Sequence, residues 1–404
     1  MIPFSPPRID DKIIAEVVDT LKSGWITTGP KTKLFEKKLT GYCGCKATVA
    51  VSSATAGLEL VLRWFGVKEG DEVIVPAYTY CATANVVIHC GAKPIMVDVN
   101  QDDFCISIEA IEKAITPHTK AIIPVDIAGL PCDYDRINQL VCLNKIKALF
   151  KANTPEQEML GRILVLSDAA HSVGAWYKNK RTGVLTDVSV FSFHAVKNLT
   201  TAEGGAISLN LPEPFDNQAL YQYFCTYMLH GQSKDALAKM QKGAWRYDVI
   251  DAGYKANMTD ILASIGLVEL ERYDSDTLIK RKHIFDVYQK AFASCKWAEL
   301  PHFEDENRTS SYHVYLLRIK NINETQRDEI IQRIFDNDVS VNVHFQPLPL
   351  LSAYKNRGYK MSDYPIAFDN YQREISLPVY YDLTDEMLQQ IIQAVKKSVE
   401  EVLS

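Results

Sequence analysis

The chain has 404 residues, of which 47% are hydrophobic and 23% charged, and its formal net charge is -6 at pH 7. The acidic balance argues against a nucleic-acid or anionic-membrane partner, and no apolar run reaches the length of a membrane span. The N-terminal residues lack the basic and long apolar regions of a signal peptide, so a cytoplasmic location is expected.

Helical and strand patterns alternate through the first half of the chain. Asp10 or Asp11 can cap a helix with one apolar face, made of Ile13, Ile14, Val17, Val18 and Leu21. Strands and helices then alternate over residues 47–52, 58–65, 72–76, 79–90, 94–99, 106–115 and 121–127, with a further strand at 163–167. This order predicts an α/β fold with a mostly parallel sheet covered on both faces, whose ligands bind at the carboxyl ends of strands.

The pattern changes near residue 254. The polar segment 138–161 is weakly periodic and reads as an extra surface helix or loop. Beyond residue 254 we expect a long helix at 258–293, strands at 312–319 and 339–345, a helix at 325–335 and a last helix from about Thr384. A chain of 404 residues is too long to fold around one hydrophobic core. The sequence therefore predicts a large domain, 1–253, and a smaller C-terminal α/β domain, 254–404.

Lys197 is the most informative single residue. It lies in a polar turn between an apolar strand that begins at Val188 and another that follows Gly204-Gly205, and the earlier strand at 163–167 runs into Asp168. A lysine on such a turn and an acid at a neighbouring strand tip suit pyridoxal phosphate, because the lysine forms a Schiff base and the acid keeps the pyridine nitrogen protonated. The alternative is a solvated surface lysine.

A phosphate site is indicated by the strand-to-helix turn Ser52-Ser-Ala-Thr55-Ala-Gly57. Small residues let backbone N–H groups approach an anion at a helix N-terminus, although Ser and Thr also cap helices routinely. The sequence contains neither a G-x-G-x-x-G nor a G-x-x-x-x-G-K-[ST] motif, which counts against a dinucleotide fold or a phosphate-loop NTPase.

Other candidate residues keep several interpretations. Asp168 and His171 could be a catalytic pair, a metal pair or a cap, but further ligands are not evident and no metal is expected. A serine hydrolase is disfavoured because no G-x-S-x-G motif occurs. The nine cysteines read as reduced core residues, with Cys43-Gly-Cys45 at most half a metal site. Tyr80 could stack on a flat ring or be a core aromatic.

Six motifs occur in a fixed order along the chain. They are Gly24-Trp-Ile-Thr-Thr-Gly-Pro30, Val51-Ser-Ser-Ala-Thr-Ala-Gly57, Asp168-Ala-Ala-His171, Phe191-Ser-Phe-His-Ala-Val-Lys-Asn198, Ala202-Glu-Gly-Gly205 and Gly253-Tyr-Lys-Ala-Asn-Met258-Thr-Asp260. Together they resemble the DegT/StrS-type nucleotide-sugar aminotransferases of pyridoxal phosphate fold type I. The resemblance covers nearly the whole chain, through His344 and Ser376-Leu-Pro378, and implies an aspartate-aminotransferase-like fold.

The resemblance also implies roles for individual residues. Lys197 would bind the cofactor covalently and shuttle a proton, Asp168 would pair with the pyridinium, and His171 would sit beside the ring hydroxyl. The remaining cofactor contacts would come from Tyr80, which stacks on the ring, from Thr55, Ala56 and Ser192, which hold the phosphate, and from Asn257, which reaches the partner subunit's cofactor. The family is thus expected to form a homodimer with shared sites.

The substrate is expected to be a nucleotide-linked sugar. The combination of Asp168-Ala-Ala-His171 with Phe191-Ser-Phe-His194 resembles the motifs of two family members. These are the enzymes that make UDP-4-amino-4-deoxy-L-arabinose and the UDP-4-amino precursor of pseudaminic acid. This implies transfer from L-glutamate to a 4-keto deoxy sugar for cell-surface glycan biosynthesis, with UDP as the expected nucleotide and dTDP or GDP as the alternatives. Candidate substrate contacts are Thr28, Lys31, His313 and His344.

Four other functions stay open at this point. A carbon-3 aminotransferase would more often carry Asp-Ala-Ala-Gln, and a sugar dehydratase of the family carries histidine in place of the lysine. The others are a non-catalytic regulatory protein on the same fold and a metal hydrolase that uses His171 and Asp168.

Overall fold

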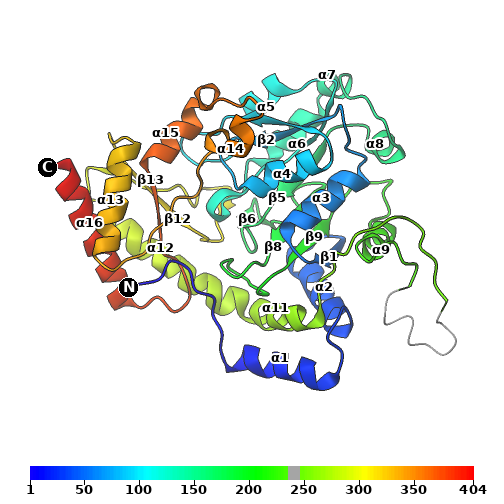
Figure 1. The fold of residues 1–404 in the computed structure, drawn as a ribbon, viewed down its shortest axis with the longest axis horizontal. Helices are drawn as coiled ribbons and strands as arrows, with labels where there is room; N and C mark the ends of the chain where they lie inside the picture. Colours follow the sequence, from blue (N-terminus) through cyan, green and yellow to red (C-terminus); the bar gives the residue numbers. More distant parts are fainter. Residues whose placement is uncertain (235–245) are drawn as a thin grey trace.

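The computed structural model describes residues 1–234 and 246–404 (Figure 1). Its main element is a seven-stranded sheet in the order β1-β9-β8-β5-β4-β2-β3. The strands are β1 (Ala47–Val51), β2 (Glu72–Pro76), β3 (Lys93–Val97), β4 (Thr119–Ile122), β5 (Leu164–Asp168), β8 (Val188–Ser192) and β9 (Gly205–Leu209). Only β9 runs antiparallel to its neighbours β1 and β8, so the predicted mostly parallel sheet is confirmed.

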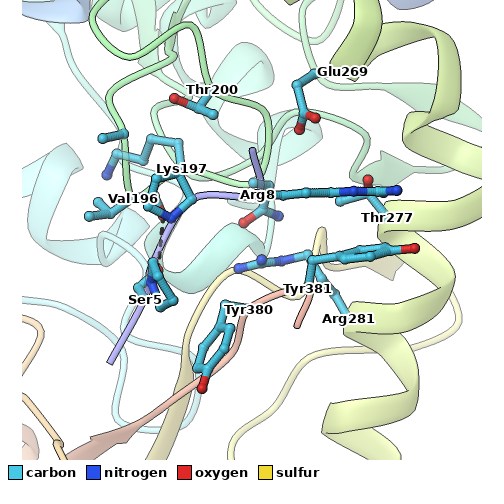
Figure 2. A pocket seen from close by; sticks show the side chains of 14 residues that line it. Ser5, Arg8, Val196, Lys197, Thr200, Glu269, Thr277, Arg281, Tyr380 and Tyr381 are labelled. Carbon is cyan, nitrogen blue, oxygen red and sulfur yellow. Dashed lines mark hydrogen bonds between the residues drawn. The ribbon is translucent and has the colours of Figure 1, made fainter. Parts of the chain in front are cut away.

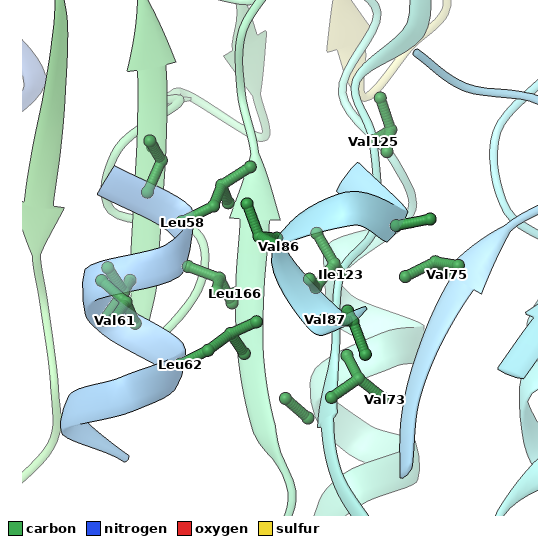
Figure 3. Close-up of a cluster of buried hydrophobic side chains, with 14 of the residues drawn as sticks. Leu58, Val61, Leu62, Val73, Val75, Val86, Val87, Ile123, Val125 and Leu166 are labelled. Atoms are coloured by element: carbon green, nitrogen blue, oxygen red, sulfur yellow. The ribbon is translucent and has the colours of Figure 1, made fainter. Parts of the chain in front are cut away.

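Helices cover both faces of this sheet because successive residues of its strands point their apolar side chains to opposite faces. On one face, Leu58 and Leu62 of α3 and Val86 of α4 pack with strand residues such as Val73 and Leu166 (Figure 3). Burying each such side chain stabilises the fold by roughly 1.5–3 kcal/mol. These helices are α3 (Ala54–Trp64), α4 (Cys81–His89) and, at the sheet's end, α9 (Asn217–Tyr227).

The opposite face is covered by two further groups of helices. Ile74, Ile122 and Val165 pack against the first group, and Ala50 and Phe191 pack against the second. The first group is α5 (Ile108–Ala114), α6 (Tyr134–Cys142) and α7 (Asn144–Lys147), and the second is α2 (Pro30–Cys43) and α11 (Asp260–Arg272). The helix α8 (Pro155–Leu160) instead lies at the end of α3, where Gln157 donates to the Phe65 carbonyl at 2.8 Å. The predicted extra segment 138–161 is therefore the end of α6 followed by α7 and α8.

A second, three-stranded sheet has its own core in the C-terminal part of the chain. It consists of β10 (Ala298–Glu299), β12 (Tyr315–Ile319) and β13 (Glu374–Leu377), packed with α12 (Leu278–Phe292), α13 (Glu324–Asp336) and α16 (Asp385–Leu403). Shorter elements here are α14 (Ser352–Lys355) and α15 (Pro365–Arg373). The helix expected at 258–293 is α11 and α12 joined by a π-helical turn, Tyr273–Thr277.

The structure contradicts one expectation, the strand at 339–345, and shows how far the helix predicted near the N-terminus is covered. Residues 339–345 were expected to form a strand, but they make only isolated bridges, Ile2 to Val339 and Asn342 to Ser376. The helix α1 (Asp11–Ser23), capped by Asp10 as predicted, buries Ile13 but leaves Ile14 51% and Leu21 53% exposed. Its apolar face is thus mostly uncovered within one chain. None of the described helices combines the length and hydropathy needed to cross a membrane.

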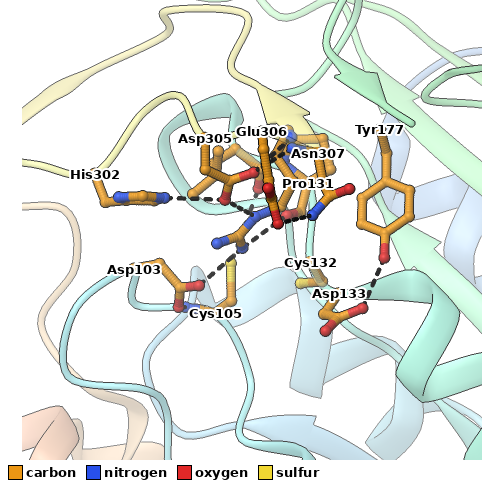
Figure 4. A network of polar contacts seen from close by, with 12 residues as sticks. Asp103, Cys105, Pro131, Cys132, Asp133, Tyr177, His302, Asp305, Glu306 and Asn307 are labelled. Carbon is orange, nitrogen blue, oxygen red and sulfur yellow. Dashed lines mark hydrogen bonds and ion pairs between the residues drawn. The ribbon is translucent and has the colours of Figure 1, made fainter. Parts of the chain in front are cut away.

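A polar network ties residues 302–309 to the large sheet's helical layer (Figure 4). Arg308 forms ion pairs with Asp103 at 2.8 Å and Asp305 at 2.7 Å. Beside it, β11 (Arg308–Thr309) pairs with β6 (Trp176–Tyr177), which pairs with β7 (Lys180–Arg181). These contacts fix the start of the segment that carries His313.

Candidate active site

A cavity of about 400 Å³ lies at the carboxyl edge of the large sheet. Strands β1, β2, β5 and β8 end at this edge, and β9, being antiparallel, begins there. The structure brings together here most of the residues that the sequence predicts: Thr55, Tyr80, Asp168, His171, Ser192, Lys197, His313 and His344.

Lys197 is held by a hydrogen-bonded turn between β8 and β9. The Phe193 N–H donates to the Gly204 carbonyl at 2.9 Å, and the Thr201 N–H donates to the Phe193 carbonyl at 2.9 Å. The Lys197 N–H itself donates to the carbonyl of His194 at 2.9 Å. The backbone that carries the lysine is therefore fixed from both sides of the turn.

Gly205 allows the start of β9 to approach the N-terminus of α3. A Cβ atom at this position would lie 2.6 Å from the Ala54 nitrogen and 2.8 Å from the Phe191 carbonyl oxygen, which is closer than real side chains approach. The absence of a side chain therefore places the hydroxyls of Ser53 and Thr55 beside the lysine turn. Such a helix N-terminus favours an anion.

Asp168 is buried at the tip of β5. Its carboxylate accepts a hydrogen bond from the Thr83 hydroxyl at 2.8 Å and one from the Ala170 N–H at 3.3 Å. Burial raises the pKa of Asp168, while these hydrogen bonds and the charge of Lys197 act in the opposite direction. The carboxylate is thus held by neutral donors and can support a positive charge in the cavity.

Lys197 lies in an environment that disfavours its charged form. Burial lowers the pKa of its amine to about 8, and the attraction of Asp168 only partly offsets this. On its other side the N-terminal segment crosses the turn, where the Ser5 hydroxyl donates to the Val196 carbonyl at 3.3 Å (Figure 2). A second, very small cavity of about 20 Å³ lies there, lined by Lys197, Arg8 and Arg281 among others.

Three histidines, His171, His313 and His344, form one wall of the cavity. The rings of His171 and His313 are 4.2 Å apart, and burial, aided by the charge of Lys197, lowers the pKa of both far below the usual range. The Nδ1 atom of His171 is buried without a hydrogen-bond partner. A buried polar atom of this kind is costly unless a bound group satisfies it.

His344 is fixed by its neighbours at several atoms. Its Nδ1 lies 2.9 Å from the Ser376 hydroxyl, which donates to Glu374 at 2.6 Å, and its backbone N–H donates to the same carboxylate at 3.0 Å. Phe4 from the N-terminal segment stacks on the imidazole at 5.5 Å. Burial lowers the pKa of His344 to about 4 and raises that of Glu374 to about 8.

Four predicted residues do not line this chain's cavity. The Ala56 N–H donates to the hydroxyl of Ser53, which caps α3, so Ala56 is part of the helix N-terminus. The Asn257 amide donates to the Thr28 hydroxyl at 2.6 Å, and Lys31 pairs with Glu16 and Asp19 at 2.8 Å each. Thr28 and Asn257 thus lie together and do not line the cavity that holds Lys197, although Asn257 pairs with Val51 at the end of β1.

Sequence reasoning missed several residues that line the cavity, among them Ser53, Thr79, Glu203 and Phe345. Ser53 and Glu203 stand inside motifs that had been recognised, so their position next to Thr55 and Gly204 was a usable signal. Phe345 belongs to the segment wrongly expected to be a strand, and no local pattern marked it. Among the described residues, no group of three or more potential ligands is placed to hold a metal ion.

A lysine on an interstrand turn, a carboxylate on the neighbouring strand tip and hydroxyls at a helix N-terminus define an enzyme of the aminotransferase type. The chain belongs to the DegT/DnrJ/EryC1/StrS aminotransferase family, whose model matches residues 7–152 and 158–396. Only residues 153–157, at the start of α8, fall outside the match within segment 138–161. Most of that segment therefore has a family counterpart, which corrects its interpretation as an addition.

Similar proteins cover essentially the whole chain. Spr1654 from Streptococcus pneumoniae, solved in a PMP form and also in PLP and apo forms, is 47% identical with a TM-score of 0.95, each chain being covered fully. The spore coat polysaccharide biosynthesis protein SpsC of Bacillus subtilis is 37% identical, with 98% of this chain and 96% of SpsC covered. Helicobacter pylori PseC, an aminotransferase involved in the biosynthesis of pseudoaminic acid, is 27% identical with a TM-score of 0.85 over 99% of both chains.

Proposed function

We propose that this protein is a pyridoxal phosphate-dependent sugar aminotransferase that moves the amino group of L-glutamate to the 4-keto carbon of a UDP-linked deoxy sugar. The observation that carries the proposal is the placement of Lys197 and Asp168 in one cavity, Asp168 at the tip of β5 and Lys197 on the turn that follows the adjacent strand β8. Family membership and the similarity to PseC support amination of a sugar. Carbon 4, UDP, glutamate and a role in cell-surface glycan synthesis remain the finer part of the proposal.

The residues present fit the cofactor. The hydroxyls of Ser53, Thr55 and Ser192 surround the N-terminus of α3 and suit its phosphate. Asp168 offers a carboxylate to the ring nitrogen, and the buried Nδ1 of His171, which has no partner within the described residues, supports a polar contact with the ring. Lys197 supplies the amine for the covalent bond, and Tyr80, 60% exposed at the cavity, can stack on the ring.

When bound, the cofactor draws electron density from the carbon that loses or gains a proton. Asp168 keeps its negative charge next to the ring nitrogen because the Thr83 hydroxyl and the Ala170 N–H hold it. Lys197 carries the proton on Nζ, and its lowered pKa lets it release and accept that proton near neutral pH. His313 and His344 face the substrate side of the cavity, where we assign them to the sugar nucleotide.

The function is tested with a panel of 3-keto and 4-keto sugar nucleotides, each incubated with glutamate and the PLP-loaded enzyme. We expect a product mass that corresponds to an amino sugar, with NMR placing nitrogen at carbon 4. Amination at carbon 3 would contradict the positional part of the proposal. Loss of water without nitrogen gain would indicate a dehydratase and overturn the transaminase.

The lowered pKa of Lys197 predicts a pH dependence of cofactor loading. Only the neutral amine forms the covalent bond, so its rate of formation from the apo form should fall about tenfold per pH unit below about 8 and level off above. Stopped-flow absorbance on the apo protein measures this rate. A midpoint near 10.5, the ordinary lysine value, would contradict the description of the site.

A homodimer is supported by the uncovered face of α1. Ile14, Val18 and Leu21 are 51%, 38% and 53% exposed and share one helical face, a pattern typical of an interface. Thr28, Lys31 and Asn257 lie near this helix rather than at their own chain's cavity, so we assign them to the partner's cavity. Sizing chromatography should give a dimer, and a fully active monomer would contradict shared sites.

Asn257→Ala should weaken retention of the cofactor about tenfold or more, because a hydrogen bond to a phosphate is lost. Equilibrium dialysis measures the retention, and Asn356→Ala, at an exposed asparagine, is the matched control. Mixing Lys197→Ala chains with Asn257→Ala chains gives hybrid dimers with one intact site each. About a quarter of all sites should then regain activity at limiting cofactor. No recovery would contradict sharing.

A further inference from the structure

Asn198 directly follows the reactive lysine, and none of the roles above uses it. It is buried, and its side chain spans from the lysine turn to the segment that carries His313. Its Nδ2 donates to the Ser311 carbonyl at 2.7 Å, and its Oδ1 lies 2.7 Å from Nδ1 of His313.

The orientation of the Asn198 amide is determined by its partners. A carbonyl only accepts hydrogen bonds, so the amide nitrogen must face Ser311 and the amide oxygen must face His313. Burial raises the pKa of the Tyr273 phenol, and the neighbouring Asn198 side chain acts in the opposite direction. Since the amide oxygen has no hydrogen, Nδ1 of His313 must carry one.

His313 is fixed in position and neutral. Its backbone N–H donates to the Ala128 carbonyl at 3.1 Å, and its carbonyl accepts from Arg281 at 2.9 Å. Burial lowers the pKa of His313 far below its usual range, and the positive charges of Lys197 and Arg281 add to this, as do His171 and His344. With Nδ1 protonated and the ring uncharged, Nε2 keeps a free lone pair.

The Nε2 atom borders the cavity. None of the described residues forms a hydrogen bond with Nε2 of His313. Unlike Nδ1 of His171, which is buried without a partner, this Nε2 atom is accessible from the cavity. The cavity wall therefore offers a neutral acceptor close to the lysine.

We propose that Asn198 is a positioning residue that locks His313 with its hydrogen on Nδ1, so that Nε2 accepts a hydrogen bond from a hydroxyl of the sugar. This inference rests on the proposed function for the identity of the ligand. It requires the substrate to bring a donor to this point, which a hydroxyl does and a keto oxygen does not.

The tautomer is tested directly on the apo protein by NMR of labelled histidines, with His313→Gln to assign the signal. We expect His313 to carry its hydrogen on Nδ1 in the wild-type chain and to shift toward the Nε2-protonated form in Asn198→Ala. Asn210→Ala, which removes a similar bond to the Val184 carbonyl, is the control and should leave the signal unchanged. A wild-type His313 protonated on Nε2, or a tautomer unaffected by Asn198→Ala, would overturn the role of Asn198.

Kinetics separate this role from a merely structural one. Asn198→Ala should lower kcat/KM of the sugar half-reaction about tenfold and leave the glutamate half-reaction within about twofold. Asn198→Asp keeps an acceptor for Nδ1 but adds a negative charge, so the pKa of His313 should rise by more than about one unit and a new acidic limb should appear in the sugar half-reaction. Equal losses in both half-reactions would overturn the assignment of Nε2 to the sugar. A wild-type enzyme that aminates no keto sugar would overturn the proposed function, while the NMR result alone still decides what Asn198 does.

Discussion

Replacing Lys197 with alanine should reduce transamination by about 10⁴-fold or more, because the chain loses both its covalent attachment point and its proton carrier. The visible absorbance band of the loaded enzyme, which borohydride should abolish in the wild type, should be absent. Turnover with glutamate and a 4-keto sugar nucleotide gives the primary measurement. The exposed Lys178, paired with Asp135, provides the control variant Lys178→Ala, which should retain full activity.

The same substitution should not destabilise the apo protein. Burial lowers the pKa of Lys197 to about 8, so at neutral pH the folded state holds a charge in surroundings that disfavour it. The penalty is present below pH 8 and disappears as pH rises toward the unfolded-state value. The thermal midpoint of Lys197→Ala at pH 7 should therefore equal or exceed that of the wild type.

Turnover that survives within about tenfold would refute the role of this lysine.

Asp168→Asn should lower kcat by about 10²–10⁴-fold while the chain keeps its fold. Asparagine retains an oxygen for the Thr83 hydroxyl, but it carries no negative charge to support a protonated ring nitrogen. The variant should also load the cofactor with a pH midpoint below about 8, since Asp168 is the charge that raises the pKa of Lys197. This second measurement separates an electrostatic effect from misfolding.

The exposed Asp135→Asn is the matched control for that experiment and should change neither kcat nor the midpoint. If Asp168→Asn lost less than about threefold in kcat and kept the midpoint of the wild type, the carboxylate would not be the partner of the cofactor ring. The division of roles between Lys197 and Asp168 would then be wrong.

Sequence reasoning located the lysine and the aspartate because both follow apolar strands, and the ends of parallel strands meet at one edge of a sheet. Thr55 was indicated by the strand-to-helix turn that holds it, whereas Ser192 was implied only by the family resemblance. Their roles toward the cofactor stay predictions, as does the division into domains 1–253 and 254–404.

Other features depend on contacts that no local pattern encodes. The alternating valines near residue 339 resemble a strand, yet pairing depends on a neighbour, and only Val339 and Asn342 find one. The sequence predicted the apolar face of α1, but a helical pattern cannot say whether its own chain or a second copy covers that face. The bond from Asn198 to His313 joins residues 115 positions apart, and only the folded structure reveals it.

The N-terminal segment has a consequence for how the molecule is made. Ile2 pairs with Val339, and Phe4 stacks on His344, so these two residues find their partners only after synthesis has passed residue 344. The large sheet is complete once β9 has emerged and can form without them. Lys197 and the residues around it at the carboxyl edge of the large sheet can thus fold early during translation. His313 and His344 join the cavity later, and Ile2 and Phe4 then find their partners.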